Sequence, residues 1–169
     1  MAETRAEAEV VRLAADLIGM DTTNRGGGDC CERPAAEYAA ARLAEAGLEP
    51  KLLEAAPGRT NVVARWEGTG SAEGALLFHG HLDVVPANPA AWSVHPFAGE
   101  ISADELWGRG AVDMKGADAA LLAVVRDWAH GQAASTRRCN RVHRRRGGHR
   151  RLRGAVAGRR APGGVRRLH

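Results

Sequence analysis

Apolar residues recur at helical spacing in three stretches of the chain, and this periodicity predicts three amphipathic helices. The first runs from Glu3 to Ile18, and Gly19 follows as its C-cap. The second runs from about Pro34, a residue favoured at helix starts, to Gly47. The third runs from Ala117 to Trp128, where alanine, leucine and valine dominate.

Short apolar runs between these helices predict β-strands. The run from Ala75 to Phe78 is bounded by Gly74 and Gly80, as expected of a buried central strand. The other predicted strands are Leu48 to Leu53, Asn61 to Trp66, and two short runs, Gly99 to Ile101 and Glu105 to Trp107, that could pair. Helices that alternate with strands predict an α/β fold in which a sheet is flanked by helices.

The charges divide the 169 residues into two unlike parts. Residues 1–129 contain all 20 acidic residues and 11 of the 24 basic residues, a net charge of −9. The last 40 residues contain 13 arginines, no lysine and no acid. Such a composition does not suit the solvated surface of the same domain. We therefore expect one folded domain over 1–129, and a disordered, arginine-rich tail over 130–169.

The first twenty residues carry four acidic side chains and no uninterrupted apolar block. This pattern predicts neither a secretory signal nor a membrane-spanning helix, and hence a cytoplasmic protein. Cys30 and Cys31 are adjacent, a geometry in which disulfides rarely form. The two thiols could in principle bind a metal, although no second cysteine pair follows at ligand spacing.

Candidate chemistry begins directly after the predicted strand at Ala75 to Phe78. On an extended chain, residues two apart point to one face, so His81 and Asp83 share a side and His79 lies on it too. A metal-bound imidazole needs its second ring nitrogen held by a carboxylate or carbonyl, which a His-x-Asp step supplies. Alternatively, His81 caps the strand, Asp83 is a turn residue and His79 is only packed.

A glycine-rich loop with Asp113 lies about thirty residues further along, from Leu106 to Gly116. Its spacing is not that of a nucleotide-binding phosphate loop, and no Lys-Ser or Lys-Thr pair follows. We expect the carboxylate of Asp113 to face His81 at the end of the sheet, where its two oxygens could bridge two cations.

Three ordered motifs together resemble one enzyme family. They are His81-Leu82-Asp83-Val84-Val85-Pro86, Trp92-Ser93-Val94-His95-Pro96-Phe97 and Gly108-Arg109-Gly110-Ala111-Val112-Asp113-Met114-Lys115-Gly116. The chain is similar, over roughly residues 5–129, to the dinuclear-zinc aminoacylases, acetylornithine deacetylases, succinyl-diaminopimelate desuccinylases and glutamate carboxypeptidases.

The resemblance implies a truncated, N-terminal portion of a zinc-dependent exopeptidase-like domain that hydrolyses amide bonds in small N-acyl amino acids or peptides. By that resemblance His81 is a metal ligand, Asp113 bridges two Zn²⁺ ions, and Asp83 serves catalysis by orienting His81. Co²⁺ or Mn²⁺ are alternative metals. In the family a glutamate takes the proton of a metal-activated water, and its neighbouring glutamate is a ligand.

The chain departs from the family after Asp127, because no acid follows and the Glu-Glu pair is missing. The later acidic and histidine ligands and the dimerisation domain are missing too. We therefore expect this chain to be an inactive fragment.

Two interpretations of the basic tail remain open. Arginines neutralise phosphates, so the tail could make the chain a non-catalytic protein that binds nucleic acid. The lack of lysine and of aromatic residues disfavours this reading.

The alternative is a frameshift between His130 and Cys139. If the tail is read one base later from Cys139, the codons permit Val-Ile-Val-Phe-Thr-Ala-Asp-Glu-Glu-Asp. The Glu pair then begins at Arg146, 33 positions after Asp113, where the family has its base and ligand.

Overall fold

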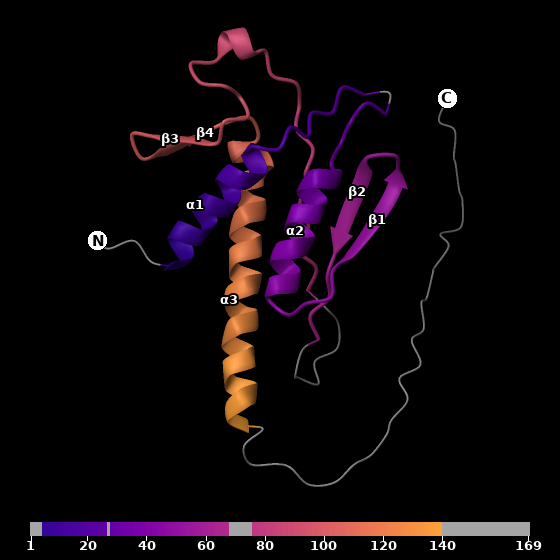
Figure 1. Ribbon diagram of the computed structural model, residues 1–169, viewed down its shortest axis with the longest axis vertical. Coiled ribbons are helices and arrows are strands. Elements are labelled where there is room, and N and C mark those ends of the chain that lie inside the picture. Colours follow the sequence, from indigo (N-terminus) through magenta and orange to yellow (C-terminus); the bar gives the residue numbers. More distant parts are fainter. Residues whose placement is uncertain (1–4, 27, 68–75, 140–169) are drawn as a thin grey trace, which may run out of the picture.

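The computed structural model describes residues 5–26, 28–67 and 76–139 of the chain (Figure 1). Its three α-helices are α1 (Arg5–Ile18), α2 (Arg33–Glu45) and α3 (Gly116–Cys139). The three predicted helices are thus confirmed, and α3 continues past the expected boundary at residue 129. None of the described helices is both long and apolar enough to span a membrane.

A small apolar core lies where the three helices meet. Its buried residues recur three or four positions apart on each helix, as the periodicity predicts. They are Leu13, Ala14 and Leu17 of α1, Ala35, Ala39 and Leu43 of α2, and Ala119, Leu122 and Ala123 of α3. The many alanines let the helix backbones approach closely, and Figure 1 shows α3 running alongside α1 and α2.

Arg126 of α3 ties the helices together from the edge of this core. Its guanidinium donates to Glu9 at 2.7 Å, to Glu45 at 3.0 Å and to the carbonyl of Arg42. The Arg126 side chain is only 11% exposed, so these bonds compensate for the burial of its charge.

The strands form two separate antiparallel hairpins. β1 (Lys51–Ala56) pairs with β2 (Arg59–Val63) and packs on α2, and β3 (Glu100–Ser102) pairs with β4 (Glu105–Trp107). The pairing of the two last short runs is therefore confirmed. The expected mixed fold of helices and sheet is confirmed as well, although each described sheet has only two strands.

The strand predicted for Ala75 to Phe78 is wrong. Ala75 lies outside the described residues, and Leu76, Leu77 and Phe78 belong to no strand and are 78%, 80% and 54% exposed. A buried central strand needs hydrogen-bonded neighbours on both edges, and no strand of the described part pairs with this run. Its apolar side chains alone cannot make it a strand.

One long-range pairing brings the candidate chemistry onto the helical core. The loop after α1 runs beside residues 82–84, with a parallel bridge between Thr23 and Val84. Thr22 Oγ1 donates to the carbonyl of Leu82 at 2.6 Å, and the amide of Val84 donates to the carbonyl of Thr22 at 3.1 Å. The segment that carries His81 and Asp83 is therefore held at the C-terminal end of α1.

Candidate metal site

The structure brings His81 and Asp113 together, although 31 residues separate them in the chain. His81 Nε2 lies 3.1 Å from Asp113 Oδ1. The His81 side chain is 47% exposed and that of Asp113 is 87% exposed, so both are open to solvent. Two ligands of one tetrahedral zinc ion lie about 3.3–3.6 Å apart when their bonds to it are about 2.0–2.2 Å long. The observed separation is a hydrogen-bond distance, and the two exposed side chains need to part by only a few tenths of an ångström, roughly, to share a cation.

The other ring nitrogen of His81 faces Asp83. Nδ1 lies 3.0 Å from the backbone carbonyl of Asp83 and 3.4 Å from its carboxylate Oδ1. Both atoms are acceptors, and so is Asp113 Oδ1 beside Nε2. A neutral imidazole carries one proton and can donate to only one side, so a proton on Nδ1 leaves the Nε2 lone pair facing Asp113, as a metal ligand requires.

The charges around His81 favour a positive species. Burial lowers the pKa of His81, but the contacts with Asp83 and Asp113 outweigh this effect and raise the pKa above its ordinary value. The two carboxylates thus stabilise a positive charge on the His81 ring. A cation bound in place of a proton on Nε2 would contact Nε2 of His81 and Oδ1 of Asp113.

Asp83 is itself held by a residue that the sequence did not indicate. Asn24 Nδ2 donates to Asp83 Oδ2 at 2.8 Å, and the backbone amide of Asn24 donates to the carbonyl of Val84 at 2.8 Å. Asn24 therefore fixes one carboxylate oxygen of Asp83, while Oδ1 stays on the side of His81. Only the long-range pairing described above reveals this contact.

The loop that carries Asp113 is anchored by a buried lysine. Asp113 lies in η2 (Ala111–Lys115), a short turn in which Asp113 itself leaves the helical conformation. Lys115 Nζ donates to the carbonyls of Leu17 at 2.8 Å and Met20 at 2.7 Å, at the C-terminal end of α1. Burial lowers the pKa of Lys115 to about 8. The lysine thus serves to anchor the loop.

Asp118 lies close behind the site and was not predicted from the sequence. It lies in the first turn of α3 and is 8% exposed, and its Oδ2 has no partner among the described residues. Burial raises the pKa of Asp118 to about 6, against the opposing charges of His81 and Lys115. A side chain on Gly80 would collide with this carboxylate, so the glycine lets α3 pack against the chain beside His81.

The remaining candidates are not part of the arrangement. His79 is exposed and makes no described contact with Asp83 or Asp113. Cys30 is buried, with Sγ 3.7 Å from the carbonyl of Thr22, and Cys31 is exposed. Within the described ranges, no cluster of three or more His, Cys, Asp or Glu side chains could hold a metal.

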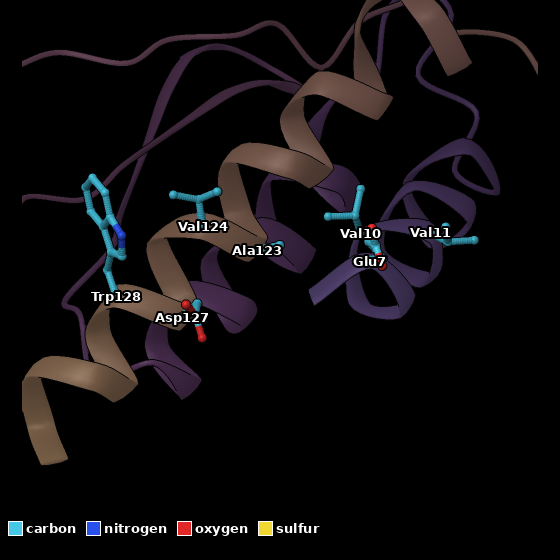
Figure 2. A pocket seen from close by; sticks show the side chains of 7 residues that line it. All are labelled: Glu7, Val10, Val11, Ala123, Val124, Asp127 and Trp128. Carbon is cyan, nitrogen blue, oxygen red and sulfur yellow. The ribbon is translucent and has the colours of Figure 1, made fainter. Parts of the chain in front are cut away.

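A cavity of about 430 Å³ contains the candidate site. Its wall includes His81, Asp83 and Asp113, together with Asn24, Trp92 and Arg109. A second depression, of about 380 Å³, lies between α1 and α3 (Figure 2). Its lining is mostly apolar, with Val10, Val11 and Trp128 among it, and the acids Glu7 and Asp127 are its only charged residues among the described ones. The pair formed by His81 and Asp113 lies in the first cavity.

Comparison with known proteins relates part of the chain to one enzyme family. Residues 77–138 match the family model described as Peptidase family M20/M25/M40, a family that generally uses divalent metals. A succinyl-diaminopimelate desuccinylase of Cereibacter sphaeroides (strain ATCC 17029 / ATH 2.4.9) is 49% identical over 122 residues, 70% of this chain and 30% of the relative. The protein of the same name from Methylorubrum populi is 47% identical over 97 residues, 54% of this chain and 24% of the relative.

These matches confirm the family resemblance for the N-terminal part of the chain. The chain spans less than a third of the length of these curated relatives. The predicted roles of His81, Asp83 and Asp113 stay predictions, supported by the distances above.

Proposed function

We propose that the N-terminal part of this chain is the metal-holding portion of a hydrolase that cleaves amide bonds in small N-acyl amino acids or peptides. One observation carries the proposal. His81 has its Nδ1 committed to Asp83 and presents Nε2 to Asp113 Oδ1 at 3.1 Å, inside an open cavity. The names of the desuccinylase relatives, which denote removal of an acyl group, support the reaction class.

His81 and Asp113 would hold the metal, with Zn²⁺ as the expected ion and Co²⁺ or Mn²⁺ as alternatives. A zinc ion held there supplies a Lewis acid that polarises the amide carbonyl and lowers the pKa of a bound water. Asp83 keeps the His81 ring oriented, and Asn24 keeps Asp83 in place. The exposed second oxygen of Asp113 is free to contact a second cation.

The chain as it stands is expected to be inactive. The only carboxylates that line the cavity belong, among the described residues, to Asp83 and Asp113. Both are used in holding His81 and the metal, so none is left to take a proton from water. Two protein ligands are also fewer than the three that usually hold a catalytic zinc.

We attribute this deficit to a frameshift in the tail. The family match ends at residue 138, and the arginine-rich run begins at Arg137. The shifted reading permits the missing Glu pair at a distance typical of the family. Residues 140–169 lie outside the described part of the chain, so the frameshift, the disorder of the tail and its alternative role in nucleic-acid binding stay predictions. The cytoplasmic location is likewise a prediction.

The test is to sequence the gene across codons 128–150, restore the frame and assay hydrolysis of N-succinyl and N-acetyl amino acids. We expect hydrolysis that a chelator abolishes and zinc restores, and that Asp113→Ala removes. His79→Ala, which changes a neighbouring histidine outside the arrangement, is the matched control and should retain activity. A downstream sequence with no Asp-Glu-Glu in any frame, or a repaired protein that needs no metal, would overturn the proposal.

A further inference from the structure

Arg109 is fixed in place by the tight packing of its own loop. Its backbone amide donates to the carbonyl of Pro96 at 2.7 Å. On one side, a side chain on Gly108 would collide with Ile18. On the other, Gly110 has a φ of +86°, and a Cβ there would lie 2.7 Å from Val84 Cγ1. The two glycines are thus needed for close backbone approach, and the residue between them has little freedom.

The guanidinium of Arg109 is poorly satisfied. It lies over the ring of Trp92, 5.4 Å from the ring centroid, and donates a single long hydrogen bond of 3.4 Å to the carbonyl of Pro86. Its Nε is buried without a hydrogen-bond partner, and no carboxylate of the described residues lies within 4.0 Å. Arg126, which is largely buried, has three acceptors by contrast.

The guanidinium of Arg109, with its unused hydrogen-bonding capacity, belongs to the candidate site. Arg109 lines the same cavity as His81, Asp83 and Asp113, and it is the only lysine or arginine among the described lining residues. The two aspartates make the cavity unfavourable for anions unless a cation offsets them. A guanidinium matches a carboxylate with two parallel hydrogen bonds, and the face of Trp92 supports its plane.

We propose that Arg109 binds a free carboxylate of the substrate and so selects N-acyl amino acids or peptides over their amidated counterparts. This inference rests on the proposed function, since it assumes that the cavity receives such a substrate. The carboxylate takes hydrogen bonds from the terminal nitrogens of Arg109, beside the metal-holding pair. Arg109 is thus a specificity-determining residue.

The test measures carboxylate binding by the full chain in the presence of EDTA, so that no metal contributes. The protein reacts with phenylglyoxal, and the modified arginines are mapped by mass spectrometry. N-acetylglycine should slow the modification of Arg109, whereas N-acetylglycinamide, which is neutral and of similar shape, should not. Arg25 and Arg65, which are exposed and lie outside the cavity, serve as internal controls whose rates should not change.

A second measurement uses the variant Arg109→Gln. Loss of a charged donor should weaken N-acetylglycine binding at least about tenfold in equilibrium dialysis, and Arg109→Lys should restore part of it. Equal protection by acid and amide, or unchanged binding by Arg109→Gln, would overturn the inference. Because the assay excludes metal, its result is independent of zinc binding by His81 and Asp113. Loss of carboxylate binding with zinc binding intact would overturn only this inference, and loss of zinc binding alone would overturn only the proposed function.

Discussion

The contact between α1 and α2 predicts an abnormal titration of Tyr38. Its hydroxyl donates to Asp16 Oδ2 at 2.5 Å, and the guanidinium of Arg42 lies 5.1 Å from the ring centroid. Partial burial and the hydrogen bond to Asp16 raise the pKa of Tyr38 to about 12, from an ordinary value of 10.0. Tyr38 is the only tyrosine in the chain, so its phenolate absorbance reports this one group.

The perturbation is Asp16→Asn. It removes the charge that holds the hydroxyl proton but leaves the ring where it is. Since the Asp16 side chain is 42% exposed and therefore screened, we expect the pKa of Tyr38 to fall by about one unit, or about 1.4 kcal/mol, and not to its ordinary value. The remaining elevation comes from the burial of the ring.

The same shift affects stability. Because the folded chain keeps the Tyr38 proton up to pH 12 and the unfolded chain loses it near pH 10, the free energy of unfolding should fall as pH rises through this window. Urea unfolding checks the slope, and Tyr38→Phe should remove it. The matched control is Glu37→Gln, which changes an exposed acid of α2 that pairs with Arg33. A wild-type pKa near 10, or equal effects of the two acid variants, would refute the reasoning.

Three further substitutions probe the packing and the site. Gly110→Ala should lower the free energy of unfolding in urea by about 1–2 kcal/mol from backbone strain, and further because the new Cβ collides with Val84. The control Gly47→Ala, which has open space around it, should show only the loss from strain. Arg126→Met leaves the carboxylate of Glu9 unpaired, and we expect a loss of about 2 kcal/mol in thermal or urea unfolding; no loss would mean that this ion pair contributes nothing. Asp83→Asn should slow a frame-restored enzyme by on the order of 10–100-fold in initial rate, and an unchanged rate would remove Asp83 from the account.

Local patterns predicted the helices because each helix buries one stripe of its own residues. Leu13 and Leu17 are fully buried, as their spacing requires. The short hairpin formed by β3 and β4 was predictable for another local reason, because its two strands are neighbours in sequence. A central strand is different, because it forms only when other strands hydrogen-bond to it. No strand of the described part pairs with Leu76 to Phe78.

The candidate site was predictable only in part. His81 and Asp83 follow from a two-residue step, and Asp113 from its position after a glycine-rich loop. Asn24 and Arg109 acquire their positions through pairings that no local pattern encodes. The bridge between Thr23 and Val84 places Asn24, and the contact with Pro96 places Arg109. Residues that support a site from distant loops need the folded chain to be found.

The central claim, that His81 and Asp113 share one metal, is tested most directly by the zinc affinity of the chain in competition with a chromophoric chelator. We expect one zinc ion bound, and an affinity that falls at least about tenfold in both His81→Ala and Asp113→Ala, since each removes one of two protein ligands. His79→Ala should bind zinc as the unaltered chain does. Equal affinities in all four proteins, or a loss only in His79→Ala, would contradict the account.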